Sequence, residues 1–165
     1  RFKWNPEIRF EYAATLRVIH SLKRPSKIFV GSTMELFGEW IHPSWQNKIF
    51  REIPLMFPQH TFIFLTKQPE GLLRWAPFPS NSWIGASATN QEMHNRAIAC
   101  LADIEASVKF ISYEPLLDEI NFSGAYNLSG IQWVIIGGLS GSRKFYPPEN
   151  WIDEIEAASD ISGIA

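Results

Sequence analysis

The chain has 165 residues, of which 45% are hydrophobic and 14% aromatic, and its formal net charge is −2. This composition excludes a disordered chain, which would carry fewer aromatic residues and more net charge, and a disulfide-built protein, which needs more than the single cysteine present. The sequence contains no apolar run of the roughly 20 residues that a membrane span requires and no recognisable secretory leader. We therefore expect a cytoplasmic protein with no membrane partner.

The predicted elements alternate between helices and strands along the chain. Apolar residues at helical spacing over residues 8–19 predict a first helix, and the β-rich run at 27–32 predicts the first strand. The remaining elements are predicted in this order: a helix at 43–53, a strand at 61–67, a short helix at 70–75, a strand at 82–87, a helix at 89–104, strands at 108–113 and 131–136, and a helix from residue 148.

The five predicted strands are nearly continuously hydrophobic, which is typical of strands covered on both faces and favours a parallel sheet. Their onsets are 34, 21, 26 and 23 residues apart, which is the rhythm of right-handed βα units. We therefore predict an α/β fold that forms a partial (β/α) TIM-like barrel of parallel strands, with an open doubly wound sheet as the alternative.

The two ends of the chain influence this prediction. Arg1 lies in the approach to a helix and Ala165 follows a helix. We therefore expect a single α/β domain over residues 1–165 that is a fragment of a larger barrel, truncated at both ends. Such a fragment would leave two strand edges open, and these edges could pair in a homodimer.

Polar residues follow the predicted strands at their carboxyl ends, where parallel α/β folds form their working surface. The candidate ligand- or cofactor-binding residues at these ends are Ser32, Ser87, Ser112, Gly137, Gly138 and Ser140. Because the carboxyl ends of parallel strands meet at one edge of the sheet, we expect these residues to converge on one site for a small molecule.

Two charged residues at the same ends are the candidate catalytic residues. Lys67 directly follows an apolar strand, so we expect its burial to be offset by a carboxylate or by an anionic ligand. Glu114 lies between Tyr113 and Pro115, where a kink would point its carboxylate toward the centre as a general base or as a partner for an amine. Lys67 and Glu114 could form a purely structural ion pair or act on a ligand.

The segment from Gly137 to Ser142 could cradle a phosphate or a carboxylate with its backbone amides. It matches no established phosphate-binding spacing, so a plain turn is an equal interpretation. The four histidines are scattered, and Cys100 lies among apolar residues at helical spacing, where it is predicted to be a small core residue. The sequence therefore predicts no metal site.

Charge is distributed unevenly along the chain. Residues 1–60 contain nine Lys or Arg and five Asp or Glu, whereas residues 61–165 contain six and twelve. The basic leading segment could approach the phosphates of a nucleic acid, or it could keep the outer face of a helix soluble. Nucleic acid is therefore one expected partner, beside a small molecule at the strand ends.

Several segments taken together resemble a known family. They are RFKWN (1–5), FVGSTMELF (29–37), LTKQP (65–69), WIGAS (83–87), FISYEPLL (110–117) and WVIIGG (133–138). In this order they resemble the family of phage gene products thirty-seven and sixty-eight, which has no assigned function. Members of that family look like radical S-adenosylmethionine enzymes.

The resemblance implies a (β/α) barrel preceded by three cysteines that would hold a [4Fe–4S] cluster and leave one iron for S-adenosylmethionine. This chain has no such cysteines, so we expect the fragment to hold no cofactor and to be inactive, and we expect both groups only in the full-length protein. The resemblance also assigns Glu35 to the barrel mouth. The chain departs from the family pattern at Tyr113 and Leu139, where the family favours Cys and Glu.

Overall fold

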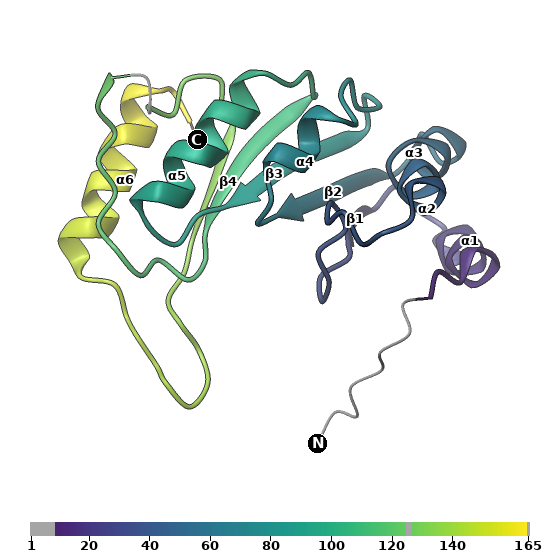
Figure 1. The fold of residues 1–165 in the computed structure, drawn as a ribbon, viewed down its shortest axis with the longest axis horizontal. Coiled ribbons are helices and arrows are strands. Elements are labelled where there is room, and N and C mark those ends of the chain that lie inside the picture. Colours follow the sequence, from purple (N-terminus) through teal and green to yellow (C-terminus); the bar gives the residue numbers. More distant parts are fainter. Residues whose placement is uncertain (1–8, 125–126, 165) are drawn as a thin grey trace.

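A computed structural model describes residues 9–124 and 127–164 of the chain. The strands are β1(Lys27–Val30), β2(Thr61–Thr66), β3(Ser82–Ser87), β4(Val108–Tyr113) and β5(Trp133–Ile136). The helices are α1(Tyr12–Ser21), α2(Pro43–Asn47), the π-helical turn η1(Lys48–Glu52), α3(Ile53–Met56), α4(Glu70–Leu73), α5(Gln91–Ala102) and α6(Glu149–Ile161). Figure 1 shows α1 and α6 at opposite ends of the molecule, with the sheet and α5 between them.

The strands form one parallel sheet in the order β1-β2-β3-β4-β5, which confirms the predicted α/β class and the parallel pairing. The sheet is open and not closed into a barrel, as the alternative interpretation expected, and β1 and β5 are its edges in the described part of the chain. Its sequential order is nevertheless that of a barrel wall, because a doubly wound sheet reverses its direction of growth at a switch point.

The parallel register divides the strand residues between two faces of the sheet. Phe64 is aligned with Ile84, and two residues further along Ala86 is aligned with Ile111. These side chains belong to the hydrophobic core. The buried Leu, Ile and Phe residues of the helices all belong to the same core cluster. The helices of the described chain therefore cover this face of the sheet.

The opposite face carries aromatic side chains that lie outside that cluster. The ring of Phe110 lies over Gly85, where an added Cβ would be 2.4 Å from the ring. Trp133 contacts both Phe110 and Trp83, with ring centroids 4.9 and 5.9 Å apart. At the edge strand, the side chain of Phe29 is 47% exposed. The hydrophobic runs of the strands thus supply a helix-covered core on one face and an aromatic layer on the other.

The predicted elements are confirmed, with small differences at their ends. β1 ends at Val30, before Gly31 takes a positive φ of 72°. The helix predicted at 43–53 includes the π-helical turn η1. Because Pro54 has no amide hydrogen and its ring crowds the carbonyl four residues earlier, a widened turn before it lets the chain continue as a helix.

Phe50 lies at the centre of an aromatic cluster between the helices and β2. Its ring stacks on Phe37, with centroids 4.3 Å apart and an interplanar angle of 9°. It also makes edge contacts with Phe64 and Trp75. Phe50 is completely buried. This cluster joins η1, the segment after β1, β2 and the residues after α4 into one unit.

Replacing Phe50 with alanine should lower the free energy of unfolding by about 3–5 kcal/mol, because the change removes buried surface and leaves a cavity. Leu55, which is 67% exposed, provides the control. The Leu55→Ala variant should change the free energy of unfolding by less than about 0.5 kcal/mol. Urea denaturation measures both values, and equal losses would contradict this description of the core.

None of the helices in the described part of the chain is long and apolar enough to cross a membrane.

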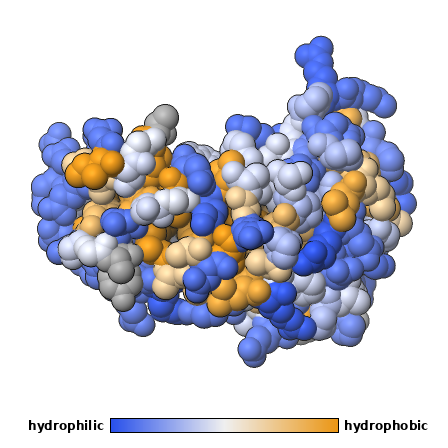
Figure 2. All heavy atoms as spheres, turned by 90° about the horizontal axis from the view of Figure 1, so that it is seen from above, coloured by the Kyte–Doolittle hydropathy of each residue, from blue (hydrophilic) through white to orange (hydrophobic). Residues whose placement is uncertain are grey.

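Figure 2 shows one face of the molecule, on which hydrophobic residues form groups bordered by hydrophilic side chains.

Candidate ligand site at the strand ends

The carboxylate of Glu35 connects the segment after β1 to the end of β2. Its Oε1 accepts hydrogen bonds from the hydroxyl of Thr66 at 2.7 Å and from the backbone amide of Phe37 at 3.0 Å. Its Oε2 accepts from the backbone amide of Lys67 at 2.8 Å. Hydrogen bonds to a charged acceptor are stronger than neutral ones. Glu35 therefore holds the loop after β1 in place beside β2.

A hollow of ≈ 320 Å³ opens beside this carboxylate at the ends of β1, β2 and β3. Three residues predicted from the sequence line it: Ser32, Lys67 and Ser87. The apolar side chains of Phe29 and Leu65 line it as well. The structure therefore brings part of the predicted set together around one small hollow with polar and apolar walls.

Ser87 and Ser112 extend this polar surface toward β4. They are register partners on β3 and β4, and they lie on the face that carries the aromatic layer. Their exposed fractions are only 4% and 1%. Within the described residues, neither hydroxyl makes a hydrogen bond. Nearly buried polar groups usually have a hydrogen-bond partner. Because these two hydroxyls have none in the described chain, they can form hydrogen bonds with a ligand.

Lys67 and Glu114 follow β2 and β4, with β3 between them. Neighbouring strands lie about 4.8 Å apart, and continuing the register puts Lys67 level with Ser112, two residues before Glu114, so the two backbone positions are about 12 Å apart. Both residues are exposed, and no ion pair joins them in the part of the chain that the structure describes. The expected burial of Lys67 is therefore wrong, because its side chain extends into solvent beyond the last residue of the strand. The purely structural ion pair is not formed either.

Glu114 lies against the start of the loop after β5. A Cβ added to Gly137 would be 3.0 Å from Cγ of Glu114 and 3.2 Å from its Oε1. The amide of Gly137 donates to the carbonyl of Tyr113 at 3.0 Å, and its carbonyl accepts from the amide of Leu116 at 2.8 Å. The missing side chain of Gly137 thus makes room for the Glu114 carboxylate at this end of the sheet.

The loop after Gly137 folds back on itself. Leu139 and Phe145 exchange two backbone hydrogen bonds of 2.8 and 3.1 Å. A Cβ on Gly138 would be 2.7 Å from the carbonyl oxygen of Phe145, so this close approach requires glycine. Ser140 follows as an exposed residue. Because the amides of Gly137 and Leu139 already have partners, an anion at this loop would depend on its remaining amides.

Tyr113 points to the helix-covered face of the sheet and belongs to the core cluster. Its hydroxyl is 2.8 Å from Nδ1 of His94 on α5, and both side chains are completely buried. Burial raises the pKa of Tyr113, so the hydroxyl stays protonated well above neutral pH. Tyr113 therefore belongs to the core behind the sheet and does not line the hollow of ≈ 320 Å³.

The hydrogen bond between Glu35 and Thr66 was not predicted from the residue pattern. The family resemblance assigned Glu35 to the mouth, and the residue pattern put both Glu35 and Thr66 at strand ends, but it did not predict the contact between them. One signal in the sequence could have revealed this hydrogen bond. Thr66 is the last residue of an apolar strand, and Glu35 lies just beyond the neighbouring strand.

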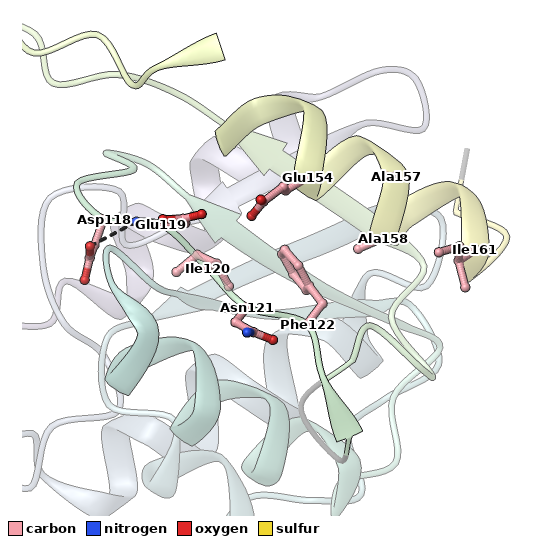
Figure 3. A pocket seen from close by; sticks show the side chains of 9 residues that line it. All are labelled: Asp118, Glu119, Ile120, Asn121, Phe122, Glu154, Ala157, Ala158 and Ile161. Atoms are coloured by element: carbon pink, nitrogen blue, oxygen red, sulfur yellow. Dashed lines mark hydrogen bonds between the residues drawn. The ribbon is translucent and has the colours of Figure 1, made fainter. Parts of the chain in front are cut away.

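A larger hollow, of ≈ 690 Å³, lies elsewhere, between α6 and residues 118–122. Figure 3 shows Phe122 and Glu154 projecting into it from opposite sides. None of the residues predicted from the sequence lines it. Size alone therefore does not identify the site at the strand ends.

A family model described as "Protein of unknown function (DUF5131)" matches residues 2–165. The chain belongs to the DUF5131 family. No curated protein and no solved structure gives a match to it. Membership of the DUF5131 family carries no assigned activity.

Replacing Glu35 with alanine should lower the free energy of unfolding by about 2 kcal/mol, because the change removes an acceptor shared by three donors. Glu39 is an exposed carboxylate on the same segment, so Glu39→Ala is the matched control, and its effect should be within about 0.5 kcal/mol. Chemical denaturation measures both variants. If the two were equally stable, the role assigned to Glu35 would be incorrect.

Tyr113→Phe should destabilise the protein by about 1–2 kcal/mol, because it removes only the hydroxyl that meets His94 and keeps the ring in the core. Thermal unfolding measures the change. Tyr146, which is 77% exposed, supplies the control Tyr146→Phe, which should leave the melting temperature unchanged. An unchanged melting temperature for Tyr113→Phe would show that the buried hydrogen bond contributes nothing.

Proposed function

We propose that this protein binds a small molecule with an anionic and a cationic group at the carboxyl ends of its strands, and that S-adenosylmethionine is this molecule. The observation that carries the proposal is the placement of Lys67 and Glu114. They are exposed opposite charges without ion-pair partners in the described chain, and they lie beyond β2 and β4 with one strand between them. The ammonium group would bind the ligand carboxylate, and the carboxylate would bind a positively charged amine or sulfonium.

The surface between the two charges supports the same proposal. Ser87 and Ser112 offer hydroxyls that have no partner in the described structure, and they can bind polar ligand atoms. Phe29 and Leu65 offer apolar surface in the adjoining hollow for a heterocyclic ring. The resemblance to the phage family with radical S-adenosylmethionine character favours this ligand over other zwitterions.

The described residues do not fit an iron–sulfur cluster. Cys100 is the chain's single cysteine and is buried on α5, where burial raises the pKa of its thiol. A [4Fe–4S] centre that leaves one iron for a ligand needs three thiolates. No group of three or more His, Cys, Asp or Glu in the described chain is arranged to hold a metal. We therefore assign ligand binding to this chain and assign no cluster to its residues.

Titration of the chain with S-adenosylmethionine in a calorimeter should show saturable binding that Lys67→Ala weakens about tenfold, because a charge-assisted contact is lost. Glu114→Ala should weaken binding by a similar factor. Lys144→Ala and Glu119→Ala change exposed residues that do not line the hollow of ≈ 320 Å³, so they are the matched controls and should leave the affinity unchanged.

Two results would contradict the proposal. If both the Lys67→Ala and the Glu114→Ala variants bound S-adenosylmethionine with wild-type affinity, these residues would not form its site. The second result is binding of inorganic phosphate at Lys67 without any binding of S-adenosylmethionine. The ligand would then be a phosphorylated molecule, which an exposed lysine at a strand end can also bind.

A further inference from the structure

A second hollow of ≈ 450 Å³ lies between the segment after β1 and helices α2 and α4. None of the residues assigned above to the strand-end site lines it. The residues whose chemistry matters here are Glu39, Trp40, Gln46, Arg74 and Trp75. Its volume lies within the range of small-molecule sites, which is roughly 300–1,000 Å³.

Gln46 on α2 is an unusual residue in this wall. It is only 2% exposed, and its Nε2 donates to the carbonyl oxygens of Leu36 and Gly38 at 2.9 and 3.4 Å. These two carbonyls require the NH₂ end of the amide, so they determine which way the amide points. The opposite atom, Oε1, has no hydrogen-bond partner in the described chain. A buried acceptor without a donor is rare and calls for a donor from outside the chain.

Trp40 supplies an aromatic surface at the same hollow. An added Cβ on Gly38 would lie 2.5 Å from two atoms of the indole ring, so the ring lies directly against the glycine backbone. Trp40 is nevertheless 58% exposed. An indole with one side on the backbone and much of its surface in solvent is a ready stacking partner for a flat ring.

The charges around the hollow are of two kinds. Arg96 and Glu70 form an ion pair of 2.8 Å that holds the pKa of Glu70 below its usual range, so this pair is ionised and occupied at neutral pH. Arg74 lies over the ring of Trp75 at 5.6 Å and has no ion-pair partner within the described residues. Its guanidinium can therefore bind an anion. The exposed carboxylate of Glu39 can accept hydrogen bonds from hydroxyl groups.

From this combination we propose that the hollow is a binding site for a nucleoside monophosphate whose base carries an amino group. The base stacks on Trp40 and donates a hydrogen bond to Oε1 of Gln46. The ribose hydroxyls face Glu39, and the phosphate binds Arg74. Such a molecule has a group for each feature of the hollow. Its flat base matches the indole of Trp40, and its amino group matches Oε1 of Gln46. Its sugar hydroxyls match the carboxylate of Glu39, and its phosphate matches the guanidinium of Arg74.

The test is a calorimetric titration of the 165-residue chain with adenosine monophosphate. Two related compounds divide the binding into its parts. Adenosine, which lacks the phosphate, should bind about tenfold more weakly, because it loses the charge-assisted contact with Arg74. Purine riboside monophosphate, which lacks the amino group, should also bind more weakly, because Oε1 of Gln46 is left without its donor.

Variants of two residues, Trp40 and Arg74, connect the binding to named side chains. Trp40→Ala should weaken adenosine monophosphate about tenfold or more through lost stacking, whereas Trp40→Phe should restore most of the affinity. Arg74→Gln should weaken adenosine monophosphate and leave adenosine unchanged. Arg143→Gln, an exposed arginine that does not line this hollow, is the matched control. Lys67→Ala should have no effect, which separates this site from the strand-end site. Circular dichroism establishes that each variant is folded.

Three results would overturn the proposal. The first is the absence of saturable binding of adenosine monophosphate to the wild-type chain. The second is unchanged binding in the folded Trp40→Ala variant. The third is binding of a short oligoadenylate in the absence of mononucleotide binding, because this would make the surface a site for single-stranded nucleic acid instead.

Discussion

Every neighbouring pair of strands in this sheet is parallel, so the chain must return along the length of the sheet before each new strand begins. Because the strand order is sequential, these returns do not change sides. The buried apolar residues of the helices accordingly gather in one cluster on one face. The same constraint brings the carboxyl ends of all five strands to one edge and leaves the other face with its aromatic layer. The position of the candidate ligand site and the position of the core both follow from the parallel direction of the strands.

Within this frame, the segment after β1 separates two hollows. Glu35 holds its first part against β2 through the amide of Lys67 and the hydroxyl of Thr66. Gln46 holds its second part against α2 through two carbonyl oxygens. The strand-end hollow begins on the Glu35 side, and the hollow with Trp40 begins a few residues later. Hydrogen bonds of the Glu35 carboxylate and of the Gln46 amide thus hold both ends of this short stretch, which has no regular secondary structure.

The two buried polar systems of the sheet act differently. On the helix-covered face, Tyr113 and His94 satisfy each other inside the core, so they contribute to stability and leave no group free. On the aromatic face, Ser87 and Ser112 are nearly as buried, yet their hydroxyls have no partner in the described chain. This contrast separates residues that satisfy each other within the fold from the residues that we propose for ligand binding. It also shows why burial by itself does not distinguish the two roles.

The amino-acid sequence by itself determined the local structure of this protein. Apolar runs bounded by polar residues specify the five strands, and helical spacing together with Pro43 and Asn90 specifies where two of the helices begin, since these signals act within a few residues of each other. It also put Ser32, Lys67 and Ser87 at strand ends, where parallel pairing had to gather them. Only the tertiary structure decided that the sheet stays open, that Lys67 and Glu114 are kept apart by β3, and that Gln46 has a buried oxygen without a donor. These features depend on distances between segments that are far apart in the chain, and no local residue pattern encodes such distances.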